Sequence, residues 1–251
     1  MEQKNIYYSD PGITQNESVV LRTTTNSTAT LVALKHNIVR PAGGGEPCDQ
    51  GLFCFGDTHT SIVSAVKQQG LTWLMLSKET PIPNEGDQVS VQLDVNHREQ
   101  RRRLHTGVHI AIRSCLNVLG GEIKVTEANI SEDASQATFA LDTSTPIDRN
   151  HIDMIVSMIN QVFIDAIPVE ATKAKSVDDA RKQYGPLFRL SERHELSGKI
   201  RLIKIGDFDI NPCAGLHWKD TAIGPCNLNI APSSNGLSGL LRIMRYTEKE
   251  T

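Results

Sequence analysis

The sequence predicts an α+β protein: a β-barrel-like N-terminal domain, residues 1–95, followed by an α+β domain, residues 96–251. Two observations predict this division. Up to about residue 95, short runs rich in Val, Thr, Ile and Leu alternate with Gly, Asn and Pro, which is typical of strands joined by turns. Beyond it, apolar residues recur at helical spacing, and helices then alternate with strands. A chain of 251 residues is long enough for one large or two modest domains.

Composition excludes several classes of protein. With 39% hydrophobic and 22% charged residues, the chain is neither disordered, collagen-like nor a coiled coil. A net charge of -3 argues against a protein that coats nucleic acid through its overall field, so any such contact is expected to be local. No run approaches the ~20 apolar residues that cross a bilayer, and residues 1–16 lack a signal-peptide pattern. We therefore expect a cytoplasmic protein without a membrane partner; its oligomeric state is not readable.

Strands are expected in the N-terminal domain within residues 17–35 and 58–95. Between them, residues 41–51 (PAGGGEPCDQG) read as a loop whose glycines allow a positive φ or close backbone approach. The alternating stretch QVSVQLDV, residues 88–95, reads as the last strand of this domain.

A helix is expected over residues 96–119, because Leu104, Val108 and Ile112 recur at helical spacing and Gly120-Gly121 supplies a stop. The later elements follow from similar patterns. They are strands in 124–141, a helix over 148–167 closed by Pro168, a short helix over 176–184 with Ser176 as N-cap, and strands in 200–205, 222–230 and 240–246.

Two short motifs have the spacing of metal ligands. His105 and His109 lie four apart on the expected helix, so both imidazoles share one face. Much later, Cys213 and His217 add a thiolate and a third imidazole, and zinc favours nitrogen and sulfur ligands. Each motif alone is more often structural, whereas the two together in one domain favour a metal site. Thr106 stands where zinc proteases carry a glutamate, which argues against a protease.

The residues around these motifs resemble the alanyl-tRNA editing (AlaX-type) proteins and the editing domain of alanyl-tRNA synthetases. The similarity covers most of the chain, in the family's order. The matching segments are PAGGGEPCDQG, NEGDQVSVQLDVNHREQRRRLHTGVH, IPVEATKAKSVDDARKQYG, GDFDINPCAGLH, KDTAIGPCNL and SGLLRIMRY. The editing-like regions occupy the chain and leave no aminoacylation core, so no synthetase activity is expected.

The resemblance implies a zinc-dependent hydrolase that removes serine, and possibly glycine, from tRNA specific for alanine. It implies zinc binding by the matching residues His105, His109, Cys213 and His217. Four simultaneous ligands would close the zinc site, whereas a free one would leave a position open to activate water. The sequence does not choose between these arrangements.

Catalytic roles are expected in the first motif, for His105, Thr106 and His109. Thr106 is the candidate for contacting a serine hydroxyl or the attacking water; alternatively, its hydroxyl bonds to its own helix backbone. Asp207 and Asp209 are either partners of a ligand imidazole or loop caps, and the latter is the commoner use.

Three residues depart from the family pattern. Ala214 and Leu216 replace a Gly and the Thr of the usual CGGTH motif, which bears on amino-acid preference. Glu46 replaces a glutamine in the glycine-rich segment, which leaves the role of that loop less secure.

An arginine run that leads into the first motif is expected to contact tRNA phosphates, since such contacts need only a local positive patch. Without the resemblance, the run is better explained as a solvated helix start partly paired with Glu99. Trp218 either closes the pocket or packs in the core. The tRNA-contact candidates are Arg98, Arg101, Arg102, Arg103, Gly43, Gly44 and Gly45, with Lys173, Lys175, Arg242 and Arg245 as possible extensions.

Three hypotheses follow. The first is the trans-editing deacylase. The second is a metal-stabilised tRNA- or protein-binding module that has lost hydrolysis, suggested by Ala214 and Leu216. The third is an aminoacyl-ester enzyme recruited to another substrate, which the altered second motif also permits.

Overall fold

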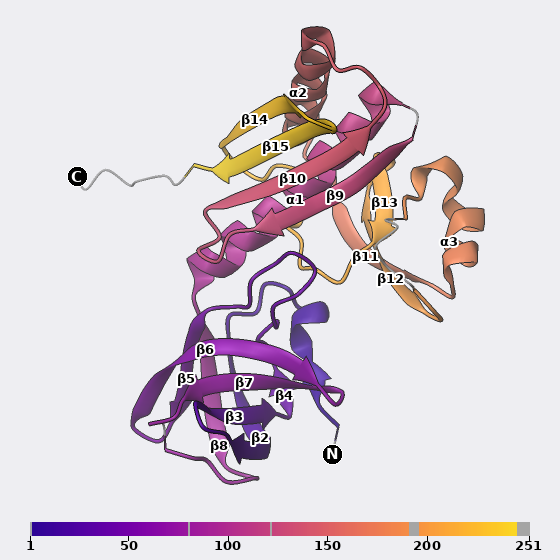
Figure 1. The fold of residues 1–251 in the computed structure, drawn as a ribbon. Helices are drawn as coiled ribbons and strands as arrows, with labels where there is room; N and C mark the ends of the chain where they lie inside the picture. Colours follow the sequence, from indigo (N-terminus) through magenta and orange to yellow (C-terminus); the bar gives the residue numbers. More distant parts are fainter. Residues whose placement is uncertain (1, 80, 121, 191–195, 245–251) are drawn as a thin grey trace. The chain divides into compact units, whose positions relative to one another are not determined.

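The computed structural model describes residues 2–79, 81–120, 122–190 and 196–244, and it has the predicted α+β class (Figure 1). The chain forms two compact units. One comprises Met1–Arg101 with Glu132–Ala134, and the other Arg102–Ser131 with Ser135–Thr251. These units divide inside a helix, so the domain boundary at residue 95 stays a prediction. None of the helices in the described part of the chain is long and apolar enough to cross a membrane.

The N-terminal unit is built on a closed six-stranded barrel with the order β2-β3-β7-β6-β5-β8. Its strands are β2 (Gln15–Thr25), β3 (Ala29–Leu34), β5 (Gly51–Phe55), β6 (Thr58–Gln68), β7 (Leu71–Ser77) and β8 (Gln88–Leu93). Buried residues alternate along β7, as expected for a strand with one face toward a core. Val32, Phe53 and Leu74 are among the fully buried residues inside the barrel.

Gly51 shows why a glycine is needed where β5 meets β8. A Cβ at this position would lie 2.4 Å from the carbonyl oxygen of Gln92 and 2.7 Å from Cα of Leu93. The closure of the barrel therefore depends on a residue without a side chain. Beside the barrel, β1 (Lys4–Asn5) and β4 (His36–Asn37) pair in parallel, and a short helix η1 (Ile6–Tyr8) follows β1.

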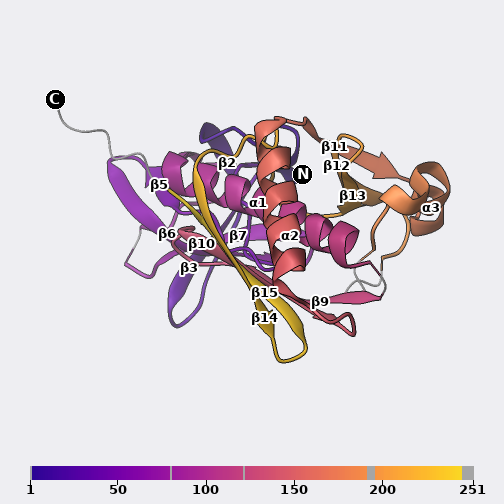
Figure 2. The ribbon, with the colours of Figure 1, turned by 90° about the horizontal axis from the view of Figure 1, so that it is seen from above.

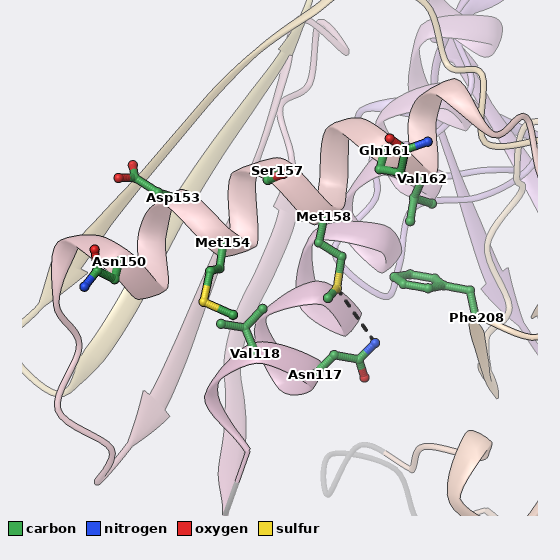
Figure 3. Close-up of a pocket in the computed structure, with 10 residues that line it drawn as sticks. All are labelled: Asn117, Val118, Asn150, Asp153, Met154, Ser157, Met158, Gln161, Val162 and Phe208. Carbon is green, nitrogen blue, oxygen red and sulfur yellow. Dashed lines mark hydrogen bonds between the residues drawn. The ribbon is translucent and has the colours of Figure 1, made fainter.

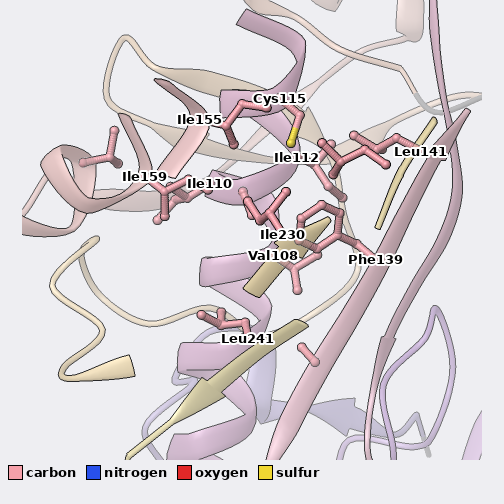
Figure 4. Packing of buried hydrophobic residues seen from close by; sticks show 14 of the residues in the cluster. Val108, Ile110, Ile112, Cys115, Phe139, Leu141, Ile155, Ile159, Ile230 and Leu241 are labelled. Carbon is pink, nitrogen blue, oxygen red and sulfur yellow. The ribbon is translucent and has the colours of Figure 1, made fainter. Parts of the chain in front are cut away.

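The C-terminal unit packs two helices on one face of a four-stranded antiparallel sheet with the order β14-β15-β10-β9 (Figure 2). The elements are α1 (Val95–Leu119), whose residues from Arg102 onward belong to this unit, β9 (Ile123–Ile130), β10 (Gln136–Thr143), α2 (Arg149–Ile164), β14 (Cys226–Ser233) and β15 (Gly236–Ile243). Ile110 of α1, Phe139 of β10 and Ile159 of α2 meet in one core (Figure 4). This core holds the middle of α1 in place.

A second, three-stranded sheet with the order β11-β12-β13 completes this unit. Its elements are β11 (Val169–Ala174), α3 (Val177–Tyr184), η2 (Gly185–Leu187), β12 (Ile200–Ile205) and β13 (Asp209–Pro212). Ala180 and Leu202 belong to a small core of its own. The chain leaves β13 directly into the second of the two metal-ligand motifs.

Several predicted boundaries are confirmed. The helix α1 runs to Leu119, and Gly120 follows it with a φ of 60°. The α2 helix begins after Asp148, whose side chain accepts a hydrogen bond from the amide of His151. Ser176 caps α3 by accepting from the amide of Asp179.

Other boundaries were wrong. The strand expected over 222–230 begins only at Cys226, because Gly224 has a φ of 90° and Pro225 lacks an amide hydrogen. The strand expected over 240–246 is β15, which ends at Ile243, and α2 ends at Ile164 rather than 167. Strands β5, β11 and β13 were not predicted. Gly121 lies outside the described residues.

Candidate metal centre

Four side chains converge in the C-terminal unit, and they are the four with metal-ligand spacing. His105 and His109 come from α1, and Cys213 and His217 from the segment after β13. One nitrogen or sulfur atom from each lies within 4.8 Å of the others. Sγ of Cys213 is 3.4 Å from Nε2 of both His105 and His217. Residues more than one hundred positions apart thus form a single cluster.

On α1, the spacing of four places both imidazoles on one face, and their ring centroids are 4.9 Å apart. Gly107 lies between them where the helix touches the large sheet. A Cβ at this position would lie 2.3 Å from Cδ2 of Leu241 and 2.9 Å from Cδ1 of Ile223. The absence of a side chain at Gly107 therefore lets the histidine-bearing turn approach the core closely.

The second motif has no regular structure of its own, and two arginines hold its backbone. Nη1 of Arg201 donates to the carbonyl oxygens of Cys213 at 2.6 Å and Gly215 at 2.9 Å. Nε of Arg102 donates to the carbonyl oxygen of His217 at 2.8 Å. These bonds satisfy three carbonyl groups that a helix or sheet would otherwise pair. The role of Arg201 was not predicted from the sequence.

The surroundings favour the metal-binding protonation states. Burial, followed by the charge of His105, lowers the pKa of His217 to about 3. Burial alone raises the pKa of the Cys213 thiol, but His105 and His217 outweigh it and hold that pKa well below its usual range. Thiolate and neutral imidazole are the forms that ligate metals.

The donor set fits a metal ion. Three imidazoles and one thiolate supply the nitrogen and sulfur ligands that zinc prefers in four-coordinate sites. Other transition metals also accept imidazole and thiolate, so the donors support a metal ion without identifying it.

Thr106 is fully buried beneath the cluster. Its Oγ1 accepts a hydrogen bond from the amide of Trp218 at 3.0 Å and lies 3.2 Å from Nδ1 of His217. A hydroxyl enclosed in this way supports the ring of His217. The expected contact between Thr106 and a substrate or a water stays a prediction.

A chain of hydrogen-bonded polar groups contacts the Nδ1 side of the His109 ring. Its Nδ1 lies 3.0 Å from Nδ2 of Asn211, which also donates to Oδ2 of Asp209 at 2.6 Å. Asp209 is fully buried and accepts from Nη2 of Arg189 at 3.2 Å, with Nη1 of Arg113 at 4.0 Å. Asp209 thus acts on the imidazole through an amide rather than directly. The other acidic candidate, Asp207, is exposed in the turn before β13.

Asn211 was missed because β13 was missed. Residues alternate between the faces of a strand, so Asp209, Asn211 and Cys213 share a side. Recognising a strand before Cys213 would have added Asn211 to the candidate Asp209.

The expected patch of four arginines on α1 needs correction. Arg98 and Arg101 are 1% and 0% exposed, and both pair with Asp49 in the N-terminal unit. Nη2 of Arg98 is 2.5 Å and Nη2 of Arg101 is 2.7 Å from that carboxylate. Burial and ion pairing give these two arginines a structural role and remove them from a phosphate-facing surface.

The other two arginines stack on Trp218. The guanidinium carbons of Arg102 and Arg103 lie 5.2 Å and 4.2 Å from its ring centroid. Trp218 is half-buried and packs against the main core, as the second of its two expected roles predicts.

Of the possible extensions, Lys173, Lys175 and Arg242 are exposed, and Arg242 donates to the side chain of Gln136. Arg245 lies outside the described residues.

The glycine-rich loop makes a tight turn. Gly43, Gly44 and Gly45 all have positive φ, and Gly43 and Glu46 exchange backbone hydrogen bonds at 3.0 and 3.3 Å. The Glu46 carboxylate, which replaces the family's glutamine, forms a buried ion pair with Arg40 at 2.6 Å. Glu46 therefore has a structural partner, and a tRNA contact by the three glycines stays a prediction.

A groove of about 1020 Å³ runs along α2 (Figure 3). Met154 and Met158 of α2 face the end of α1, and Phe208 lies at one end of the groove. Nδ2 of Asn117 approaches Sδ of Met158 at 3.9 Å. None of the four clustered His and Cys residues lines this groove, so it is separate from the candidate metal centre.

No protein-family profile matches the chain. Alanyl-tRNA editing protein AlaX-L of Pyrococcus horikoshii is 26% identical over 220 residues, which cover 87% of this chain and 52% of that protein. Alanine–tRNA ligase of Halorubrum lacusprofundi is 28% identical over 221 residues, covering 88% of this chain and 23% of the ligase. The enzyme of the same name from Haloquadratum walsbyi is 30% identical over 86% of this chain and 22% of the ligase.

The chain thus spans about half of AlaX-L and less than a quarter of these two ligases. The similarity includes most of this chain in each comparison. The predicted resemblance to alanyl-tRNA editing proteins and alanyl-tRNA synthetases is therefore confirmed.

Proposed function

We propose that this protein is a zinc-dependent trans-editing hydrolase that deacylates tRNA specific for alanine when it carries serine or glycine. The observation that carries the proposal is the cluster of His105, His109, Cys213 and His217, within a chain similar to a protein named for alanyl-tRNA editing. The tRNA substrate places the proposed reaction in the cytoplasm. The proposed editing domain comprises residues 96–251, after a β-rich domain of residues 1–95.

A separate hydrolytic site is useful because binding alone discriminates poorly between alanine and amino acids of similar size. A pocket sized for alanine cannot firmly reject glycine, which is smaller, or serine, which only adds a hydroxyl. The mistake is corrected by hydrolysing the ester that joins the wrong amino acid to tRNA. We propose serine as the main substrate and glycine as a second one.

The residues of this chain have three tasks in the proposed reaction. The four clustered side chains hold the metal next to the ester. Thr106 supports the ring of His217. Arg102 and Arg201 fix the backbone between Cys213 and His217. When bound, zinc supplies a Lewis acid that polarises the ester carbonyl and favours attack by water.

Purified protein incubated with seryl-, glycyl- and alanyl-tRNA specific for alanine tests the proposal. We expect rapid loss of the seryl ester, slower loss of the glycyl ester and little loss of the alanyl ester. The double variant His105→Ala, Cys213→Ala should lose this activity because two potential ligands are gone. No ester loss above background with any substrate, or full activity in the double variant, would overturn the proposal.

The second candidate is a tRNA- or protein-binding module without hydrolysis. Leu216 favours it, because this position carries a threonine in the related motif and here holds a fully buried apolar side chain. Ala214 is exposed in the same segment. This candidate predicts retained metal and tRNA binding with no ester loss in the same assay.

A further inference from the structure

A row of three residues crosses the second sheet of the C-terminal unit and ends at the candidate metal centre. Lys173 on β11 is directly opposite Arg201 on β12. The amide of Cys213 donates to the carbonyl oxygen of Arg201 at 3.3 Å, which continues the pairing of β12 with β13 one residue beyond Pro212. Residues that face each other in an antiparallel pair project on the same side of the sheet. Lys173 therefore lies on the same face as Cys213, two strands away.

The spacing of this row suits a contact with a molecule that is bound at the centre. Neighbouring strands lie about 4.8 Å apart, so the Cα atoms of Lys173 and Cys213 are about 10 Å apart across the sheet. A lysine side chain adds a flexible stem of four carbons. Its ammonium group is therefore able to reach a bound substrate without contacting the clustered His and Cys side chains.

The side chain of Lys173 is available for such a contact. Two arginines near this face are engaged by the protein, because Arg201 donates to two carbonyl oxygens of the second motif and Arg189 donates to Asp209. Lys173 is exposed, and in the part of the chain that the structure describes no hydrogen bond or ion pair holds its ammonium group.

The opposite face of the same sheet packs against α3. Leu202 of β12 and Ala180 of α3 belong to one small core on this side. Lys204 alternates with Arg201 and Ile203 along β12 and shares the face of Leu202, where it is opposite Glu170 of β11. The sheet thus carries one lysine on the face of the metal centre and another on the face away from it.

The proposed substrate has an anionic group at a matching place. The amino acid is esterified to the ribose of the last nucleotide, so the nearest negative charge belongs to the phosphate that joins the last two nucleotides. A cationic side chain neutralises such a phosphate and releases a counterion. Phosphate contacts of this kind position a nucleic acid without reading its bases.

We infer that Lys173 binds the phosphate that joins the last two nucleotides of the tRNA, and that this contact positions the ester at the candidate metal centre. The inference rests on the proposed function and deepens it, because it names the part of the substrate that this residue holds. The phosphate takes no part in the bond changes. Its contact with Lys173 therefore contributes equally to binding of the ground state and of the transition state, and it acts on KM rather than on kcat.

Binding without an ester tests the contact. Fluorescence anisotropy compares the zinc-loaded full chain with two uncharged single-stranded oligonucleotides that end in CCA, one of which has a neutral methylphosphonate in place of its last phosphate. The wild type should bind the oligonucleotide with the natural phosphate about threefold to fivefold more tightly. Lys173→Gln should bind both oligonucleotides with the same, weaker affinity, because the group that senses this charge is gone.

Two further variants serve as controls. Lys173→Arg keeps the positive charge and should keep the preference of the wild type. Lys204→Gln removes a lysine from the opposite face and should also keep it. A wild type without the preference, or a Lys173→Gln variant that retains it in full, would overturn the inference. Equal loss of the preference in Lys204→Gln would overturn it as well, since general charge would then explain the effect.

Kinetics with two small esters locate the contact in the reaction. Seryl-adenosine lacks the phosphate, whereas the seryl ester of the dinucleotide CpA contains it. Lys173→Gln should raise KM for the dinucleotide ester about threefold to fivefold and leave kcat unchanged, with no effect on seryl-adenosine. An equal effect on both esters would contradict a contact with this phosphate.

The two experiments separate this inference from the proposed function. Absence of ester loss together with the expected preference between the oligonucleotides would overturn the proposed hydrolysis alone. Ester loss that is the same in Lys173→Gln and in the wild type, with either ester, would overturn the inference and leave the proposed hydrolysis in place.

Discussion

The hydroxyl of Thr106 serves two groups of the second motif, although it lies in the first. It accepts from the amide of Trp218 and lies within hydrogen-bond distance of Nδ1 of His217. Thr106→Val keeps the shape and removes both interactions. Because buried polar groups are left without a partner, we expect a loss of about 1–3 kcal/mol in the free energy of unfolding.

The same substitution should weaken zinc binding, since the ring of His217 loses its support. Thr106→Ser is the matched control, because it keeps the hydroxyl, and it should remain near the wild type. Denaturant unfolding and a zinc competition assay measure the two effects. Equal behaviour of the Val and Ser variants would contradict the assigned contacts.

At Gly107, the structure predicts that substitution by alanine lowers stability, whereas helix propensity alone predicts that it raises stability. In an open helix, Gly→Ala adds about 1 kcal/mol of stability. Here the added Cβ would meet the fully buried Leu241 and Ile223 at 2.3 and 2.9 Å. Overpacking of this kind costs about 1–3 kcal/mol, so Gly107→Ala should lower the free energy of unfolding. Denaturant unfolding of Gly107→Ala and of the control Asn160→Ala, at an exposed α2 position, measures whether the change in free energy of unfolding is negative. A stabilised Gly107→Ala would contradict the close approach.

At the scale of elements, one buried carboxylate ties the start of α1 to the barrel unit. Asp49 pairs with Arg98 and Arg101, and all three side chains are 1% exposed or less. Breaking a buried pair costs about 3–5 kcal/mol, because it leaves an uncompensated charge. Asp49→Ala should therefore destabilise the N-terminal unit strongly.

The matched control is Glu85→Ala, which breaks an exposed pair with Arg22 in the same unit. Such pairs contribute about 0–1 kcal/mol, so thermal unfolding should hardly change. Comparable decreases in the unfolding temperature of the two variants would show that the buried ion pairs stabilise the protein no more than the exposed one.

The sequence predicted α1 well because a long amphipathic helix repeats its pattern many times. It also predicted the cluster, because the spacing of the ligands within each motif can be read without knowledge of the fold. The prediction of a surface position for Arg98 and Arg101 is wrong, because residues that are close in sequence point to different faces of a helix. On a helix, positions 98, 101, 105 and 108 fall on one stripe, and that stripe is buried.

Strand β13 shows a different limit of sequence reading. Its residues Asp209–Pro212 include three types that are depleted in strands, so local propensity argues against it. Pairing with β12 overrides that propensity, from Leu202 with Pro212 to Ile205 with Asp209. Long-range pairing is not visible in a local pattern, and Asn211 was lost with it.

At the scale of the whole molecule, a net charge of -3 must be reconciled with the polyanionic tRNA that we propose as the substrate. Burial removes Arg98 and Arg101 as contacts, while Arg102 donates to the carbonyl oxygen of His217 and Arg242 to the side chain of Gln136. The cationic candidates that remain in the C-terminal unit are then Arg103, Lys173 and Lys175. If each neutralises one phosphate, the logarithm of the binding constant should fall with the logarithm of salt concentration with a slope of about -3. The proposed tRNA interaction is therefore modest in affinity and local in extent.

Fluorescence anisotropy with tRNA specific for alanine, across a series of salt concentrations, measures this slope. The double variant Lys173→Gln, Lys175→Gln should bind more weakly and bring the slope to about -1, because two counterion-releasing contacts are lost. Lys67→Gln is the matched control, an exposed lysine on barrel strand β6, and should leave both affinity and slope unchanged. A slope unaffected by the double variant, or reduced equally by Lys67→Gln, would move the tRNA contact away from β11 and show that general surface charge governs binding.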